Sequence, residues 1–475
     1  MRSRFFDVCL TGSRFLDNTK TLKKYLSSYW IRSAFYSILQ RFSTTLFGLI
    51  NFVVLIRTLS KPQMGTWALF LIVTTIFEIT KGSLLKNAHI RYVSTSGDKT
   101  ERAAVASASL LINVAITVIF ALLIAFFSDW LSNWLHAGTD LSQMLKWFIP
   151  GLFGMVLFSH LEAVQQSHLD FKGVFAGYFT RQIAFFVIIV GHTLLKIPFS
   201  LAQLAIYQSA CIFLGSLVIY LYSRPYLLYR FNPTWIWIKR IFGYGGYIFS
   251  SGIIGNVFAN LDQILTARFI PDGKSVASYN AATRITQMLD VPSYAAADVL
   301  FPKASMASIQ EGSDKVRYLY ERMVAALLCF TVPIGLVIVA VPKLIITIIA
   351  GARYLDAAPI LQLYAISGML GPMQNQAANL LNSMGKSGLC FLLNVLQLTL
   401  KLGINLVCLK YIGFYGTAWG SMITGILAVA GWQIVLNKII GTKLSGIIEF
   451  MVDFYKKIFT NFNNIFQKPK KAPGA

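Results

Sequence analysis

Charged residues are scarce in this sequence, and acidic residues are the scarcest of them. Asp, Glu, Lys and Arg together make up 13% of the 475 residues, about half the share that soluble globular proteins carry. Only 19 residues are Asp or Glu, against 42 Lys and Arg, which gives a formal net charge of +23. So few charged residues argue against a disordered chain, a coiled coil and an ordinary soluble enzyme.

Cysteine and the motifs of common active sites are also rare. The five cysteines include no C-x-x-C pair, which argues against a disulfide framework and against a zinc site. The sequence contains no Walker lysine loop, no G-x-S-x-G and no H-E-x-x-H. We therefore predict a protein that is not an enzyme and that has no catalytic residue, no metal site and no cofactor.

Apolar residues dominate instead, at 56% of the chain, and they occur in long runs. A run of about 20 apolar residues is long enough to cross a bilayer as a helix. We therefore predict an all-α membrane protein with twelve transmembrane helices. The predicted spans cover residues 31–56, 66–86, 104–127, 146–167, 174–195, 201–222, 241–267, 277–301, 321–348, 358–382, 388–409 and 413–436.

Lys and Arg are distributed unevenly over the predicted loops and tails. Most of them fall in the two tails and in the loops on the same side as the N-terminus. Because Lys and Arg concentrate in cytoplasmic loops, we expect both termini to lie in the cytoplasm. The same rule accounts for the positive net charge, so we expect no nucleic acid partner.

Similarities between the two halves of the chain predict an internal repeat. Arg57 and Arg268 lie in related surroundings at an offset of 211 residues, and Gly173 and Gly388 at an offset of 215. Two units of six spans each would be parallel bundles around a central cavity, related by an axis along the membrane normal. The predicted parts are a basic cytoplasmic tail (1–30), a six-helix bundle (31–222), a cytoplasmic linker (223–240), a second six-helix bundle (241–436) and a basic amphipathic cytoplasmic tail (437–475).

Four basic side chains lie at least seven residues from either end of a predicted span, and a fifth, Arg57, lies at the outer end of span 1. The four are Arg41, Arg181, Arg284 and Lys401. A charge at the centre of a bilayer costs at least about 2.5–3.5 kcal/mol, so each should face a wet cavity or a partner. Arg41 and Arg284 come from different halves, and a guanidinium can donate two hydrogen bonds to one phosphate.

Acidic side chains are found inside the predicted spans as well. They are Glu78, Glu162, Asp262, Asp290 and Asp298. Such residues are functional candidates in a membrane, with internal ion pairs as the structural alternative. They could neutralise the arginines or bind a coupling proton or cation, and the sequence does not choose between these roles.

Three of the prolines inside the predicted spans lie in spans 8 and 9. Pro292 lies in span 8, while Pro333 and Pro342 lie in span 9. A proline inside a helix removes a backbone donor and clashes with the preceding turn. We therefore expect each of the three to kink or unwind its helix.

This layout and three local stretches resemble a known family of transporters. The stretches are Arg-Thr-Leu-Ser-Lys-Pro-Gln-Met-Gly-Thr-Trp-Ala at 57–68, Gly-Tyr-Gly-Gly at 243–246 and Ala-Ser-Tyr-Asn-Ala-Ala-Thr-Arg at 277–284. Over about residues 30–440 the chain is similar to the polysaccharide-export (O-antigen type) flippases. These belong to the multidrug/oligosaccharidyl-lipid/polysaccharide exporter superfamily.

The resemblance implies a function, a location and partners. Such a protein moves an undecaprenyl-diphosphate-linked oligosaccharide from the cytoplasmic to the periplasmic leaflet of the bacterial inner membrane. A cationic cavity holds the anionic head group while the lipid tail stays among the membrane lipids, and a polysaccharide polymerase and a chain-length regulator are candidate partners. The resemblance places Arg41 and Arg284 in that cavity, with Arg57, Arg181 and Lys401 as further candidates. Lipid II flippases usually have two more spans, so the implied cargo is an O-antigen-type or related repeat unit.

Two alternatives stay open from the sequence. A drug/cation antiporter of the same superfamily would use intramembrane carboxylates such as Asp262 and Asp290. A membrane-embedded polymerase or ligase acting on lipid-linked sugars would need a large outward loop with catalytic carboxylates, and we find none among the predicted loops.

Overall fold

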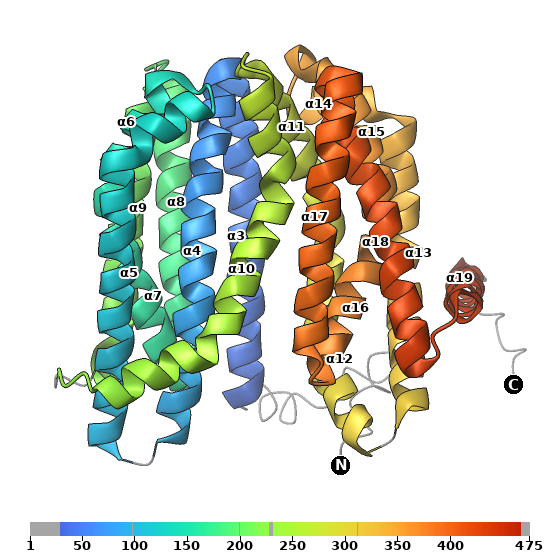
Figure 1. The fold of residues 1–475 in the computed structure, drawn as a ribbon, viewed down its shortest axis with the longest axis horizontal. Coiled ribbons are helices and arrows are strands. Elements are labelled where there is room, and N and C mark those ends of the chain that lie inside the picture. The colour runs from blue at the N-terminus through green and yellow to red at the C-terminus, as the bar shows by residue number, and fades with distance from the viewer. Residues whose placement is uncertain (1–28, 97, 199, 228–230, 311, 467–475) are drawn as a thin grey trace, which may run out of the picture. The chain divides into compact units, whose positions relative to one another are not determined.

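The computed structural model describes residues 29–466 apart from 97, 199, 228–230 and 311. Within these residues every regular element is a helix and no strand occurs (Figure 1). The tail predicted at 1–30 falls almost entirely outside the described residues, as do the last nine residues of the tail predicted at 437–475. The all-α prediction is confirmed.

The predicted spans of the first half all fall on helices. Span 4 alone is divided, because a break at Phe148 bends its two pieces by 45°. The helices are α3 (Tyr29–Thr58), α4 (Lys61–Thr95), α5 (Lys99–Trp134), α6 (Gly138–Trp147), α7 (Ile149–Ser167), α8 (Lys172–Leu194) and α9 (Leu201–Ser223), followed by the short η1 (Arg224–Tyr226).

The predicted spans of the second half also fall on helices, but three of them are broken. The elements are α10 (Trp235–Phe269), α11 (Lys274–Thr286), η2 (Gln287–Asp290), α12 (Val291–Gln310), α13 (Ser313–Ala340), α14 (Pro342–Ile349), η3 (Ala352–Ala357), α15 (Ala358–Met369), α16 (Gly371–Ser383), α17 (Ser387–Ile412), η4 (Gly413–Tyr415), α18 (Gly416–Ile440) and α19 (Leu444–Phe466). The predicted breaks occur at Pro292 and Pro342, whereas Pro333 lies inside an unbroken α13.

The helices carry large apolar side chains on exposed faces, as expected of a multi-pass membrane protein. Phe126, Leu194 and Leu217 are more than half exposed. By length and composition, seven described stretches can cross a membrane, or up to eight if the bent pair α6–α7 counts as one. The number twelve therefore stays a prediction.

The chain divides into two compact units that do not follow the predicted half-way boundary. The first unit contains Lys81–Ile124, Trp147–Gly246 and the described part of Met1–Val54. In it α9 packs against both α7 and α8 (Figure 1). Gly177 allows the closest approach, since a Cβ there would lie 2.2 Å from a side-chain carbon of Ile219.

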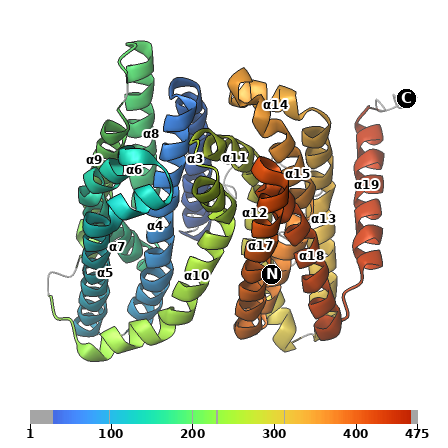
Figure 2. The ribbon, with the colours of Figure 1, turned by 45° about the horizontal axis from the view of Figure 1, so that its top comes forward.

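The second unit contains Leu55–Thr80, Ala125–Lys146 and the described part of Tyr247–Ala475. Its apolar core lies among α12, α13, α16, α18 and α19, and buries Tyr320, Trp432 and Leu436. The helices α17 and α18 run side by side in Figure 1 and in Figure 2. Helix α19 covers the amphipathic stretch predicted from the sequence and packs against α13.

Helix ends recur at the offsets seen in the sequence. Helices α3 and α10 end at Thr58 and Phe269, which are 211 residues apart. Helices α8 and α17 begin at Lys172 and Ser387, which are 215 residues apart. The internal repeat itself stays a prediction.

Two arginines of the second unit donate to the last carbonyl groups of helices α14 and α3. Arg57, in the last turn of α3, donates to the carbonyl oxygens of Ile348 and Ile349 at the end of α14. Arg353 in η3 donates to the carbonyl oxygen of Ile56, near the end of α3. The last carbonyls of a helix lack partners within it, so each arginine satisfies groups that the helix cannot. We call this arrangement the arginine clasp.

Candidate functional site

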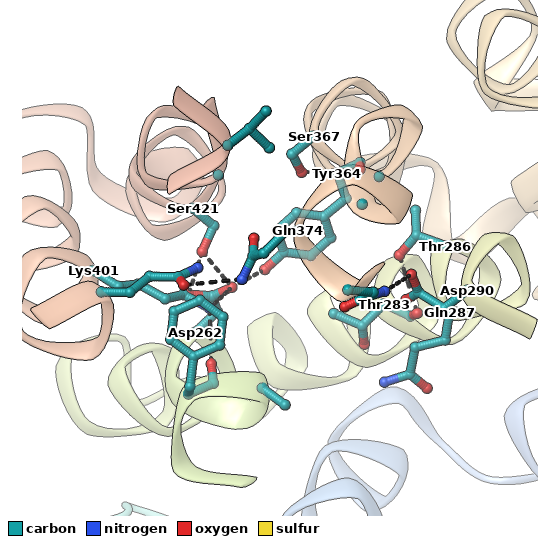
Figure 3. Close-up of a pocket in the computed structure, with 18 of the residues that line it drawn as sticks. Asp262, Thr283, Thr286, Gln287, Asp290, Tyr364, Ser367, Gln374, Lys401 and Ser421 are labelled. Carbon is teal, nitrogen blue, oxygen red and sulfur yellow. Dashed lines mark hydrogen bonds and ion pairs between the residues drawn. The ribbon is translucent and has the colours of Figure 1, made fainter. Parts of the chain in front are cut away.

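The second unit encloses a partly open polar cavity with a volume of about 440 Å³, which is drawn in Figure 3. This size falls within the ~300–1,000 Å³ range of small-molecule sites in proteins. Its walls come from α10, α11, η2, α12, α15, α16, α17 and α18. The lining residues fall within predicted spans 7, 8, 10, 11 and 12, where apolar side chains would be the norm.

Helical spacing places the cavity-lining residues of α17 on one face of that helix, and those of α18 likewise on one face. Gln397 and Lys401 are four residues apart on α17. Ser421 and Gly425 are likewise four apart on α18. Residues at this spacing share one face of a helix, so each helix turns one narrow stripe toward the cavity.

Two helix breaks border the cavity. Span 8 changes to the tighter turn η2 at Gln287–Asp290 before α12 resumes with Pro292 in its first turn. Span 10 breaks at Leu370, where Pro372 stands at the start of α16. Proline cannot supply the backbone donor that would continue the preceding helix. Broken helices inside a membrane are tolerated where they line a cavity, and the break at Leu370 is one that the sequence prediction missed.

Asp262 lies at one end of the cavity and is only 4% exposed. Its carboxylate accepts hydrogen bonds from the Tyr364 hydroxyl at 2.6 Å, the Asn405 amide at 2.6 Å and the Ser421 hydroxyl at 2.7 Å. Figure 3 shows Ser421 pointing toward it. A carboxylate has about four acceptor sites, so these donors occupy most of them.

Lys401 supplies the positive charge beside Asp262. Its Nζ lies 3.3 Å from a carboxylate oxygen of Asp262 and donates to the carbonyl oxygen of Phe258 at 2.9 Å. Both side chains are at least nine-tenths buried. The structure thus joins a predicted substrate-binding cation to a predicted coupling carboxylate, two residues 139 positions apart in the sequence.

Asp290 lies on the other side of the close-up from Asp262, whereas Gln374 is drawn near Asp262 and Lys401 (Figure 3). Asp290 accepts one hydrogen bond from the Asn375 amide at 3.3 Å. Gln374 donates to the Oε1 atom of Gln397 at 2.9 Å. These amides were not predicted as site residues, because neutral side chains in a membrane span carry no charge signal. Of these amides, only Gln374 and Asn375 lie close to Pro372, at the start of the helix that follows the break.

The remaining basic candidates of the second unit behave differently from one another. Arg284, on α11, is exposed, and it makes no hydrogen bond or ion pair within the part of the chain that the structure describes. Arg57 is engaged in the arginine clasp. The cavity of Figure 3 is not lined by either residue.

The basic candidates of the first unit are Arg41 and Arg181. Arg41 is exposed on α3. Arg181, on α8, is half-buried with its guanidinium 5.8 Å from the centre of the Phe158 ring. A cationic cavity shared by Arg41 and Arg284 stays a prediction.

The other acidic candidates are distributed over both units. Glu162 forms an ion pair with Lys86 at 2.7 Å, and also accepts from Gln166 and Tyr178. Glu78 is half-buried on α4. Asp298 lies outside the residues whose side chains the structure describes. Among the described residues, no three His, Cys, Asp or Glu side chains are grouped so as to hold a metal ion.

Comparison with protein families gives one match that spans most of the chain. Residues 54–359 match the family described as "Polysaccharide biosynthesis protein". The matched segment reaches from the end of α3 into α15 and includes Asp262, Arg284 and Asp290.

Several curated proteins are similar to parts of the chain. The teichuronic acid biosynthesis protein TuaB of Bacillus subtilis is 28% identical over 34% of this chain and 34% of its own length. The lipopolysaccharide biosynthesis protein WzxC of Escherichia coli is 21% identical over 46% of this chain and 44% of its own. These alignments cover less than half of either relative. A membrane protein from the cps region of Klebsiella pneumoniae is 21% identical over 90% of this chain and 85% of its own.

Solved transporter structures share the fold. The lipid II flippase MurJ in an inward closed conformation superposes with a TM-score of 0.73 at 14% identity, covering 92% of this chain and 94% of MurJ. An inward-facing MATE multidrug transporter of the MOP superfamily gives a TM-score of 0.74 at 14% identity, over 86% and 96% of the two chains. At such identities the likeness establishes the fold alone.

Proposed function

The chain belongs to the polysaccharide biosynthesis protein family, and from this premise we propose that it is a flippase for a lipid-linked oligosaccharide. The proposed cargo is an undecaprenyl-diphosphate-linked repeat unit of an O-antigen or related polysaccharide. The proposed activity is transport from the cytoplasmic to the periplasmic leaflet and involves no enzymatic step. The relatives WzxC and TuaB, named for lipopolysaccharide and teichuronic acid biosynthesis, support the polysaccharide connection.

The proposed mechanism is alternating access with the diphosphate held by arginine. The head group binds Arg284 and Arg41 facing the cytoplasm, the two bundles rock, and the head group leaves on the periplasmic side. The lipid tail stays in the bilayer throughout. An interior-negative potential favours the outward movement of negative charge by about 2.3 kcal/mol per charge per 100 mV.

The proposed setting is the bacterial inner membrane with both termini in the cytoplasm. The excess of Lys and Arg in the tails and in the loops on the N-terminal side supports this orientation. A polysaccharide polymerase and a chain-length regulator are the proposed partners, since they would use the exported repeat unit.

The observation that carries the proposal is the state of Arg284. It lies in a predicted membrane span, is exposed, and has no partner within the described residues. An arginine without a partner in a membrane is costly. The phosphate groups of a transported anion would supply the negative charge and the hydrogen-bond acceptors that this guanidinium lacks.

The test is transport by reconstituted protein with Arg284 replaced. In proteoliposomes that contain the lipid-linked repeat unit, Arg284→Ala should abolish the appearance of sugar on the opposite leaflet, and Arg284→Lys should restore only part of it, because an ammonium binds phosphate as a point charge. Lys274→Ala is the matched control, since it removes a positive charge from the exposed start of the same helix. Full transport by Arg284→Ala would contradict the proposal.

One observation favours a second candidate, a drug/cation antiporter. The cavity of Figure 3 is lined by two carboxylates and one lysine, so it suits a cationic ligand better than an anion. A deletion strain that becomes sensitive to cationic drugs while its surface polysaccharide stays normal would support the antiporter. Loss of surface polysaccharide with unchanged drug sensitivity would support the flippase.

A further inference from the structure

We propose that the cavity of the second unit is a sugar subsite, which binds a neutral, hydroxyl-rich ring of the transported oligosaccharide. This inference rests on the proposed function and assigns to the cavity a part of the cargo different from the diphosphate. Three observations carry it: the charge of the lining, an amide donor without an acceptor, and a carboxylate with spare acceptor capacity.

The charge of the lining excludes the diphosphate. Among the described residues that line the cavity, Asp262 and Asp290 are acidic and Lys401 is basic, which leaves a formal charge of −1. The single ammonium already faces Asp262 at 3.3 Å. Like charges near one another are disfavoured in a site of low polarity. The lining therefore suits a ligand without negative charge.

Gln397 points to a missing hydrogen-bond acceptor. Its side chain is 6% exposed, and its Oε1 atom accepts from Gln374 Nε2 at 2.9 Å and from Trp432 Nε1 at 3.3 Å. Those two donors fix the orientation of the amide, so its Nε2 must be the donor. This buried Nε2 has no partner among the described residues. Buried donors are almost always paired, and an oxygen of a ligand in the cavity would pair this one.

Asp290 and its neighbours supply complementary acceptors. Asp290 accepts a single hydrogen bond from a described residue, the one from Asn375. Gln287 adds an exposed amide, and Figure 3 shows it beside Asp290 and Thr286. A sugar ring presents hydroxyl groups that both donate and accept, so it matches a wall of amides and a carboxylate. The rings of Phe258 and Tyr294 offer apolar surface for the C–H face of the sugar.

The ligand must therefore offer several hydroxyl donors and acceptors, carry no negative charge and fit about 440 Å³. A lone coupling ion would leave most of that volume empty and would not pair the orphan amide donor of Gln397, which requires an acceptor. A sugar unit meets all of these conditions at once.

The experiment measures binding to the full-length protein in lipid nanodiscs with two probes. One probe is undecaprenyl diphosphate without sugar, and the other is the same lipid bearing the repeat unit. The test variants are Asn375→Ala and Gln374→Ala. The matched control is Asn379→Ala, one turn further along α16, which donates to the carbonyl oxygen of Ala297 and does not line the cavity.

We expect each test variant to weaken binding of the sugar-bearing lipid by about tenfold, the effect of losing one hydrogen bond to a buried ligand. Binding of undecaprenyl diphosphate should stay unchanged in both, and Asn379→Ala should bind each probe as the wild type does. Arg284→Ala should weaken both probes.

Four outcomes would overturn the subsite. The test variants could bind the sugar-bearing lipid as the wild type does, or they could lose both probes equally, which would indicate a role in the diphosphate site or in folding. Ethidium or Na⁺ binding to the wild type that disappears in Asn375→Ala would make the cavity a cation site. Equal affinity of the wild type for the two probes would show that the protein does not bind the sugar. Failure of the wild type to bind either lipid would instead overturn the proposed function, on which the subsite depends.

Discussion

Two buried carboxylates, one in each unit, are held by similar groups in different surroundings. Glu162 in the first unit has Lys86, Tyr178 and Gln166 as partners. Asp262 in the second unit has a lysine, a tyrosine, an asparagine and a serine. The difference lies in the lysine, because the side chain of Lys86 is 33% exposed and that of Lys401 is 7% exposed.

This comparison shows that a buried carboxylate is not in itself a site. Glu162 has its partners and a lysine that reaches the surface, which is the arrangement of an ion pair that joins helices. Asp262 is equally well paired, but its lysine is buried with it, and it lines a cavity in which Gln397 has a buried amide donor without a partner among the described residues. The burial of the paired lysine, and not the charge of the carboxylate, distinguishes the two regions.

Removing the buried Lys401 should cause the largest loss of stability. Lys401→Met leaves Asp262 buried beside neutral donors only, and loss of one partner of a buried pair costs about 3–5 kcal/mol. Thermal unfolding of the purified protein should show a strongly lowered melting temperature. Adding Asp262→Asn to this variant should recover much of the loss, and a single variant as stable as the wild type would show that the pair does not stabilise the fold.

A smaller loss of stability is expected when the contact between Gly420 on α18 and Asn405 on α17 is overpacked. In Gly420→Ala the new Cβ would lie 2.2 Å from the Oδ1 atom of Asn405, which donates to Asp262 through its amide nitrogen. Overpacking of this kind costs about 1–3 kcal/mol. Gly403→Ala on α17 is the control, because its Cβ would meet nothing within 4 Å. Equal melting temperatures for the two variants would contradict the contact.

The smallest loss of stability is expected when Lys86 of the first unit is replaced. Lys86→Met removes an ammonium that is one-third exposed, and Glu162 keeps Tyr178 and Gln166 as donors. Because water can reach this pair, the expected loss of stability is about 1 kcal/mol. A melting temperature as low as that of Lys401→Met would remove the distinction between the two regions.

Much of the fold could be predicted from the sequence because apolar run length determines where a membrane helix lies. Each predicted span falls on helix, and the breaks at Pro292 and Pro342 follow from the chemistry of proline. The break at Leu370 has the same cause, because Pro372 stands at the start of α16. The proline rule alone does not separate Pro333, which lies inside the unbroken α13, from Pro342, which begins α14 after a break at Val341.

Less of the candidate site could be predicted. Charge identified Asp262, Asp290 and Lys401 one at a time, but the pairing of Asp262 with Lys401 depends on how α10 and α17 pack. The amides Gln374 and Gln397 also line the cavity, but they carry no charge, so the pattern of intramembrane charges does not indicate them. Arg57 stays a predicted candidate for the head-group cavity, and the structure adds that it donates to backbone carbonyls, which occur at every residue and give no sequence signal.

The arginine clasp has a consequence for the response of this end of the second unit to salt. Arg57 and Arg353 donate to main-chain oxygens, which carry no net charge, so the clasp is not an ion pair between two full charges. Mobile ions screen the attraction between two full charges at a protein surface. High ionic strength should therefore weaken the neighbouring ion pair between Lys61 and Asp356 more than it weakens the clasp.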